Sequence, residues 1–291
     1  MFTVVLLTSP INPGLEPALV ESLRNAWGGG DAVWLAPDEV AEFSIDAVPG
    51  NLADVWASCQ ALGVDLITVE TATRRKKMLL ADMDSTMIQQ ECIDELADEA
   101  GVGPRVKDIT ARAMNGELDF EGALRERVGL LKGLSADVIE KVLAERITMM
   151  PGGQTLVATM KAQGGYTALV SGGFTAFTAF VAEVLGFDEN RANKLLIERG
   201  VLTGEVGMPI LGKQAKIDAL EEITGRIGLA ESDVIAVGDG ANDLGMLGRA
   251  GLGIALHAKP SVAAQCDVRV NFGDLSALLY VQGYSKNDFA V

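Results

Sequence analysis

Met78-Leu79-Leu80-Ala81-Asp82-Met83-Asp84-Ser85-Thr86 is the stretch that decides the fold of this 291-residue chain, because an apolar run passes directly into carboxylates and hydroxyls. A short, continuous apolar run is typical of a strand that is buried on both faces. We therefore expect Met78–Ala81 to be such a strand. Asp82 and Asp84 are two residues apart, so in extended backbone their side chains would point the same way.

Two later apolar runs end in the same manner. Thr167–Val170 leads into Ser171-Gly172-Gly173, and Val234–Val237 leads into Gly238-Asp239-Gly240-Ala241-Asn242-Asp243. Helical stretches separate these runs, which indicates a parallel sheet covered by helices on both faces. The carboxyl ends of parallel strands share one edge, where open α/β sheets bind their ligands, so the three polar clusters should meet in space. The expected fold class is α/β, with a Rossmann-like parallel sheet.

Residues 1–73 have a different organisation. Their pattern predicts the order strand, helix, strand, strand, helix, strand, which is that of a ferredoxin-like module. The predicted elements are Phe2–Thr8, Pro17–Asn25, Ala32–Leu35, Glu42–Ile45, Ala53–Leu62 and Leu66–Val69. From Ile88 to Ala144 the pattern is largely helical and interrupts the strand–helix alternation, which indicates a separate cap. The expected domains are residues 1–73 and residues 74–291, with the cap inserted at about 88–148.

Composition and charge limit the partners. With 48% hydrophobic and 22% charged residues, the chain is an ordinary globular protein. Its formal net charge of −16 argues against a nucleic-acid partner, and an anionic substrate would need positive charge at the site itself. No apolar stretch reaches the roughly 18 residues of a membrane span, and Phe2–Leu7 lacks the basic leading region of a signal peptide. Cys59, Cys92 and Cys266 lie far apart in the sequence, which favours small buried side chains in a reducing, cytoplasmic compartment.

The polar residues at the predicted sheet edge indicate phosphate chemistry assisted by a hard cation. Asp82, Asp84 and Asp239 would gather carboxylates without histidine, a donor set that suits Mg²⁺. Ser171 and the backbone N–H groups of the glycines after it can hold phosphate oxygens, because glycine allows close approach of backbone. Lys216 lies just inside a predicted helix start and could add the positive charge that phosphate requires.

These clusters, taken in order, resemble the four motifs of the haloacid dehalogenase (HAD) superfamily, and within it the phosphoserine phosphatases. The residues that carry the superfamily resemblance are Asp82-Met83-Asp84-Ser85-Thr86, Ser171-Gly172-Gly173, Lys216 and Gly238-Asp239-Gly240-Ala241-Asn242-Asp243. The segments similar to the substrate-recognition segments of phosphoserine phosphatases are Glu91–Glu95, Asn115–Phe120 and Leu124–Val128. The resemblance covers roughly residues 78–284, whereas residues 1–73 are similar, more loosely, to ACT-like amino-acid-binding modules.

The resemblance implies a Mg²⁺-dependent hydrolase that converts O-phosphoserine to serine and phosphate, the last step of serine biosynthesis. It makes Asp82 the nucleophile that becomes an aspartyl-phosphate, and Asp84 the acid that protonates the serine oxygen and then activates water. These roles need an ionised Asp82 and a protonated Asp84 at the start. The implied metal ligands are Asp82, Asp84 (through either its side chain or its backbone carbonyl) and Asp239. The implied phosphate-binding residues are Ser171, Gly172 and Lys216, with Asn242 near the phosphate.

The same resemblance assigns Glu91 and Arg127, both in the predicted cap, to the serine part of the substrate. A carboxylate suits the ammonium group, and the planar guanidinium suits the carboxylate. Arg125 competes with Arg127 for this role. The roles of Phe120 (pocket wall or core aromatic) and of Asp243 (orienting metal-bound waters or Lys216) stay open. If the cap residues serve another purpose, the alternative is a HAD phosphatase acting on another small phosphomonoester.

Residues 1–73 raise a second class of function. ACT-like modules bind amino acids and mediate dimerisation, so the looser resemblance implies an amino-acid effector and a homodimer formed through this module. His257 is the only histidine, which excludes a multi-histidine metal site, and we expect it in a structural loop.

Overall fold

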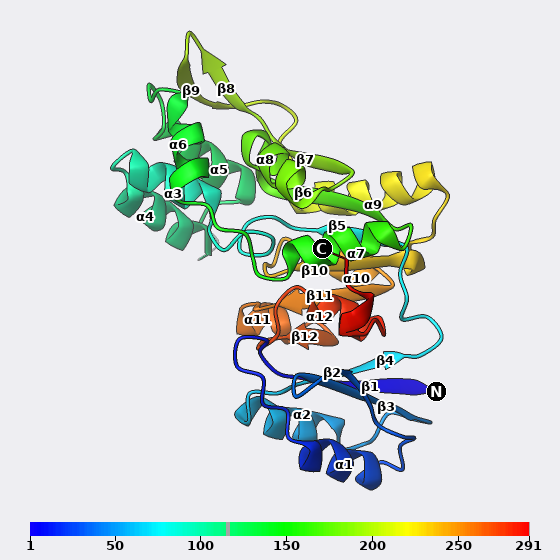
Figure 1. Ribbon diagram of the computed structural model, residues 1–291. Coiled ribbons are helices and arrows are strands. Elements are labelled where there is room, and N and C mark those ends of the chain that lie inside the picture. Colours follow the sequence, from blue (N-terminus) through cyan, green and yellow to red (C-terminus); the bar gives the residue numbers. More distant parts are fainter. Residues whose placement is uncertain (115–116, 291) are drawn as a thin grey trace.

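The computed structural model describes residues 1–114 and 117–290. Within these residues the chain forms a six-stranded parallel sheet, a four-stranded antiparallel sheet and a two-stranded hairpin (Figure 1). The strands of the parallel sheet are β5 (Met78–Ala81), β6 (Tyr166–Phe174), β7 (Glu189–Asn193), β10 (Val234–Gly238), β11 (Leu252–Leu256) and β12 (Val268–Val270). Their order is β12-β11-β10-β5-β6-β7, so the three strands that precede the polar clusters are neighbours.

Helices cover both faces of the parallel sheet, which confirms the predicted α/β class. One face packs on α7 (Gly153–Ala162), α8 (Thr175–Leu185) and α12 (Ala277–Val281), and the other on α9 (Lys213–Ile227) and α10 (Leu244–Arg249). In β5, Leu79 belongs to the first core and Leu80 to the second. This alternation is why the strand is apolar throughout.

A helical cap follows β5 and is attached at one place. It contains α3 (Cys92–Glu99), α4 (Gly103–Met114), α5 (Phe120–Gly129) and α6 (Asp137–Glu145). The segments that enter and leave it lie side by side, since Ile88 and Met149 form an antiparallel bridge and the Met150 N–H donates to the Met87 carbonyl at 2.9 Å. None of the helices among the described residues is long and apolar enough to cross a bilayer.

The hairpin of β8 (Leu195–Glu198) and β9 (Val201–Val206) packs on the cap (Figure 1). The backbone of Leu202 accepts from the Gly133 N–H and donates to the Leu134 carbonyl, both at 2.8 Å. The chain therefore leaves the end of β7, contacts the cap, and returns to the sheet at the start of α9.

The N-terminal module has the predicted ferredoxin-like order. Its elements are β1 (Phe2–Leu7), α1 (Pro17–Ala26), β2 (Val33–Ala36), β3 (Val40–Ile45), α2 (Leu52–Ala61) and β4 (Asp65–Glu70), and its strand order is β2-β3-β1-β4. Side chains on one face of this sheet, such as Val4 and Leu6, form a core with α1 and α2. Those on the other face, such as Val5 and Leu7, join the core of the part that contains the parallel sheet, which we call the body.

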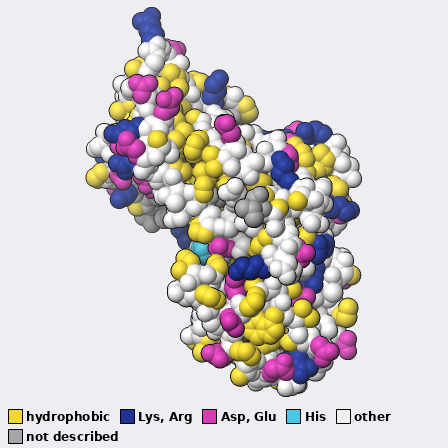
Figure 2. Space-filling model, viewed as in Figure 1, with side chains coloured by type: hydrophobic (Ala, Val, Ile, Leu, Met, Phe, Trp, Pro, Cys, Tyr) yellow, Lys and Arg dark blue, Asp and Glu magenta, His cyan; other side chains and the backbone are white. Residues whose placement is uncertain are grey.

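Polar contacts fix this module to the body. The Asp65 carboxylate, fully buried at the start of β4, accepts hydrogen bonds from the backbone N–H groups of Asn271 (3.0 Å), Phe272 (2.9 Å) and Gly273 (3.1 Å). The Arg74 guanidinium donates two hydrogen bonds, of 2.6 and 3.0 Å, to the Glu42 carboxylate. Figure 2 shows the result as a lower lobe joined to the body at a narrower waist.

Several predicted boundaries differ from the structure. The strand predicted over Thr167–Val170 continues as β6 through the glycines to Phe174, and edge strand β7 was not predicted. Helix α10 begins at Leu244, because residues 241–243 form a turn in which the Asp243 N–H donates to the Gly240 carbonyl at 3.0 Å. In the predicted recognition segment, Asn115 and Gly116 lie outside the described residues.

Candidate active site

A cavity of about 560 Å³ opens at the carboxyl edge of the parallel sheet, beneath the cap. It contains eight of the nine predicted site residues, namely Asp82, Asp84, Glu91, Arg127, Ser171, Gly172, Asp239 and Asn242. The ninth, Lys216, is buried behind Asp82. The expectation that clusters far apart in the sequence meet at one sheet edge is therefore met in the geometry.

Lys216 joins two aspartates that follow different strands, Asp82 after β5 and Asp243 in the turn after β10. Its Nζ lies 2.6 Å from Asp82 Oδ1 and 2.5 Å from Asp243 Oδ1, and its side chain is 2% exposed. Asp243 also accepts the Gly240 N–H through Oδ2 at 2.9 Å, so both of its oxygens are engaged. Burial lowers the pKa of Lys216, but Asp82 and Asp243 outweigh it and the net pKa is raised. Asp243 thus orients Lys216, one of the two roles left open above.

Asp82 is buried at the end of β5. Burial and the neighbouring Asp243 raise its pKa, against the opposing charge of Lys216. Asp82 Oδ1 forms a buried ion pair with Lys216 Nζ at 2.6 Å.

Asp84 turns toward the cap. Its Oδ1 accepts the backbone N–H of Cys92 at 3.0 Å, and its Oδ2 lies 3.4 Å from Ser171 Oγ and 3.5 Å from Cys92 Sγ. Burial, and then the charge of Glu91, raise the pKa of Asp84 to about 7. The carboxyl group can therefore hold a proton near neutral pH, as a general acid must.

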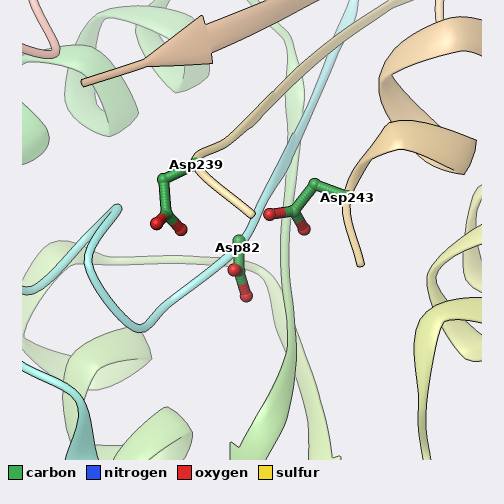
Figure 3. Close-up of side chains that lie close together, drawn as sticks. All are labelled: Asp82, Asp239 and Asp243. Carbon is green, nitrogen blue, oxygen red and sulfur yellow. The ribbon is translucent and has the colours of Figure 1, made fainter. Parts of the chain in front are cut away.

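The carboxylates of Asp82, Asp239 and Asp243 converge (Figure 3), each offering one oxygen within 4.8 Å of the others. Burial, then Asp243 and Glu91, raise the pKa of Asp239 to about 6. The donor set is all oxygen, which suits a hard divalent cation. Since both oxygens of Asp243 are engaged, Asp82 and Asp239 are the side chains best placed to bind a metal. The Asp84 carboxylate lies outside the group, so Asp84 would have to reach a metal through its backbone.

The loop Ser171-Gly172-Gly173 interrupts the pairing of β6 with β7. Ser171 Oγ accepts the Gly173 N–H at 2.9 Å, which fixes the turn of this loop. A Cβ at Gly173 would lie 2.6 Å from Asp84 Oδ2, so only glycine allows the loop to approach the acid this closely. All three residues of the loop line the cavity.

Two cap residues face the cavity from above. Glu91, which precedes α3, accepts from Ser85 Oγ at 2.9 Å, and Arg127 comes from α5. Arg125 pairs instead with Glu121 at 2.6 Å, outside the cavity, so the geometry favours Arg127. Phe120 lines the cavity, which supports its role as a pocket wall.

Several residues that line the cavity were given no individual role by the sequence, among them Cys92, Lys259 and Ser261. Cys92 is buried as expected and contacts Asp84. Lys259 and Ser261 follow β11, a strand that ends at the same sheet edge, and this position was the available signal. His257 serves the loop role expected of it, with Nε2 2.7 Å from the Gly273 carbonyl.

Comparisons with known proteins agree with this geometry. Residues 79–248 match the family model of haloacid dehalogenase-like hydrolases. A phosphoserine phosphatase from Streptomyces coelicolor is 43% identical over 98% of this chain and 71% of its own. A probable phosphoserine phosphatase from Vibrio cholerae, solved unliganded, is 34% identical with a TM-score of 0.81, covering 99% of this chain and 88% of its own. A phospho-aspartyl intermediate analogue of phosphoserine phosphatase is 43% identical with a TM-score of 0.66, covering 71% and 98%.

Fold and site together define a hydrolase that works at the carboxyl edge of a capped parallel sheet. The chain belongs to the haloacid dehalogenase-like hydrolases and, within them, to the phosphoserine phosphatase family.

The carboxylate cluster predicts that the effect of Asp239→Asn on the melting temperature depends on whether metal is bound. In EDTA the variant should unfold at the same temperature as wild type or higher, because ionised Asp239 is disfavoured among its neighbours. Magnesium at about a hundred times its dissociation constant should raise the melting temperature of wild type by about 5 °C, and that of the variant hardly at all. Calorimetry provides the measurement. Asp46→Asn, at an exposed position of the N-terminal module, is the control and should keep the full magnesium effect.

Proposed function

We propose that this chain hydrolyses O-phosphoserine to serine and phosphate through an aspartyl-phosphate on Asp82. The observation that carries the proposal is that one cavity unites Asp82 and Asp84 from the sheet with Glu91 and Arg127 from the cap. Phosphoserine offers a phosphate, an ammonium and a carboxylate, and the cavity presents a group suited to each. The similar proteins from Streptomyces and Vibrio, described as phosphoserine phosphatases, support the same reading.

In the first step, the Asp82 carboxylate attacks phosphorus and the bond from phosphorus to the serine oxygen breaks. Asp84 gives its proton to that oxygen, and serine leaves. In the second step, Asp84, now ionised, takes a proton from water, which attacks the aspartyl-phosphate and releases phosphate from Asp82. The raised pKa of Asp84, about 7, supports its use first as an acid and then as a base.

The phosphate would be held by the backbone of Gly172, by the Ser171 hydroxyl and by Lys216, with Asn242 at the cavity wall. We propose that Glu91 binds the substrate ammonium and that Arg127 binds the carboxylate. Both come from the cap, so their engagement would close the cap and exclude water from the intermediate.

We also propose Mg²⁺ as the resident metal, held by the side chains of Asp82 and Asp239 and by the backbone carbonyl of Asp84. The all-oxygen donor set supports this choice over softer metals. When bound, Mg²⁺ would supply the positive charge that lets a phosphate approach this acidic chain and that favours ionised Asp82.

The proposed domains are residues 1–73 and 74–291, with the cap inserted at about 88–148. The two separate sheets and the bridge from Ile88 to Met149 at the base of the cap support this division. We further propose a reducing, cytoplasmic location, which the three buried cysteines, none in a disulfide, support.

We propose finally that two chains pair through the N-terminal module. Strand β2 lies at an edge of its sheet and carries Val33 and Trp34, which are 53% and 36% exposed. An exposed apolar edge strand is a template for pairing with another strand, and a second copy of the same strand fits it.

The covalent mechanism predicts that Asp82→Asn lowers kcat for phosphoserine at least about a thousandfold. The amide keeps the shape of the carboxylate but cannot form the acyl phosphate. Acid quenching with ³²P-labelled phosphoserine should trap label on wild type and none on the variant. Label on the variant, or activity above a thousandth of wild type with unchanged circular dichroism, would contradict a nucleophilic Asp82.

Substrate recognition by the cap predicts a selective loss in Arg127→Ala. Loss of a charged, bidentate contact should raise KM for phosphoserine by about 10- to 100-fold, while kcat/KM for p-nitrophenyl phosphate changes less than about twofold. Arg125→Ala, on the same helix, is the matched control and should leave both substrates unaffected. Equal kcat/KM of wild type for phosphoserine and for sugar phosphates would instead favour the alternative of a HAD phosphatase for another phosphomonoester.

Pairing through β2 predicts that the full chain sediments as a dimer and that Trp34→Lys sediments as a monomer, because a charge on an edge strand opposes pairing. Activity should persist in the variant, since β2 lies outside the catalytic body. Ile11→Lys, which places the same charge at a position of the module that is 78% exposed, should stay dimeric. A monomeric wild type would refute the proposal.

A further inference from the structure

Asn193, the last residue of edge strand β7, connects two segments of the active site. Its side-chain amide is buried, with the residue 1% exposed, and makes three hydrogen bonds to backbone. Nδ2 donates to the Gly172 carbonyl at 2.9 Å and to the Leu211 carbonyl at 3.0 Å, and Oδ1 accepts the Leu211 N–H at 2.7 Å. The amide therefore satisfies both of its donors and holds two loops at once.

The hydrogen bond to the Gly172 carbonyl lies where the pairing of β6 with β7 is interrupted. Val170 pairs with Arg191 and Phe174 pairs with Asn193, so residues 171–173 of β6 lie opposite the single residue Ala192 of β7. The extra residues form the phosphate loop and remove Gly172 from the ladder. The Gly172 carbonyl is partly buried, and the Asn193 side chain donates the hydrogen bond that the neighbouring backbone does not.

The other two bonds close a long excursion of the chain. Between Asn193 and Leu211 the chain forms the hairpin that packs on the cap. Directly after Leu211, Gly212 precedes α9, the helix that carries Lys216. One amide thus sets the distance between the phosphate loop and the base of the helix that presents Lys216 to Asp82.

The cap rests on the same two places. A Cβ at Gly172 would lie 3.2 Å from Phe120 Cζ, and a Cβ at Gly212 would lie 3.1 Å from Phe120 Cδ1. Phe120 therefore packs on the two backbone segments that Asn193 holds together. Asn193 therefore also fixes the spacing of the two backbone segments on which Phe120 of the cap packs.

We propose that Asn193 is a positioning residue for phosphate transfer, holding the Gly172 loop in register with the helix that carries Lys216. It reaches neither the substrate nor the reacting atoms and acts through the backbone of its partners. The inference rests on the proposed phosphate-binding role of the Ser171–Gly173 loop and of Lys216.

The test uses Asn193→Ala and Asn193→Asp in the full-length protein. Asn193→Ala removes all three hydrogen bonds of the side chain. Asn193→Asp keeps the shape of the side chain but replaces the Nδ2 donor, which faces two carbonyls, with an acceptor oxygen. A displacement of about 1 Å at a reacting group costs about a hundredfold in rate, so kcat/KM should fall by about that factor in both variants. Because the phosphate group is the part that the two substrates and inorganic phosphate have in common, kcat/KM should fall equally for phosphoserine and p-nitrophenyl phosphate. For the same reason the inhibition constant of inorganic phosphate should rise.

Gln282→Ala is the matched control. Gln282 is also a fully buried amide bonded to backbone, accepting the Lys76 N–H at 3.1 Å and donating to the Leu278 carbonyl at 3.0 Å, but it does not line the cavity. Its loss should lower the melting temperature while kcat/KM per folded molecule stays within about twofold. The Asn193 variants should differ from it in kinetics at comparable stability.

Three results would overturn the proposal: unchanged kcat/KM in both Asn193 variants, a loss confined to phosphoserine, or failure of both variants to fold, which would make the role structural. The outcome is separable from that of the proposed function. If wild type cleaves p-nitrophenyl phosphate but not phosphoserine, the proposed substrate fails, and the role of Asn193 is still decided by the aryl phosphate and by inorganic phosphate.

Discussion

The buried ammonium of Lys216, held between Asp82 and Asp243, is the interaction on which the site depends. A charge this deeply buried must be paired, and its two partners come from the end of β5 and from the turn after β10. The pairing therefore fixes α9 against two neighbouring strands. It also leaves an excess of negative charge at the sheet edge, because one ammonium faces two carboxylates with Asp239 beside them. A divalent cation balances that excess, so the same cluster that orients Lys216 also creates a demand for metal.

Much of this arrangement could be predicted from the sequence. The apolar runs of β5 and β10 are unambiguous because both faces of the sheet are covered, and the clusters that follow them had to meet at one edge. Strand β7 could not be predicted, since Glu189-Asn190-Arg191-Ala192-Asn193 has no apolar pattern and is set in place by its neighbour β6. Asn193 could not be predicted either. Its role depends on the bulge of β6 opposite it, and that bulge is visible only in the register of β6 with β7.

Within the site, the identities of the functional residues were easier to predict than the directions in which their side chains point. The choice between Arg125 and Arg127 depends on which side of α5 faces the sheet, and helical spacing alone does not fix this. The Asp84 side chain turns to the Cys92 N–H, because the chain leaves the strand after Ala81 and Ser85 adopts a positive φ of 54°. That turn separates the two carboxylates chemically, placing one beside Lys216 and the other beside Glu91.

The N-terminal module shows how a second fold can become part of the catalytic body. A ferredoxin-like sheet has one face free of its own helices, and here that face is covered by the body, with Val5 and Leu7 in a shared core. The segment that receives Asp65, residues 271–273, continues to Leu275, whose N–H donates to the Pro151 carbonyl just after the cap. The module and the exit from the cap are thus bound to one loop. Because the module is fixed on this side, β2 is the sheet edge that remains for contact with another molecule.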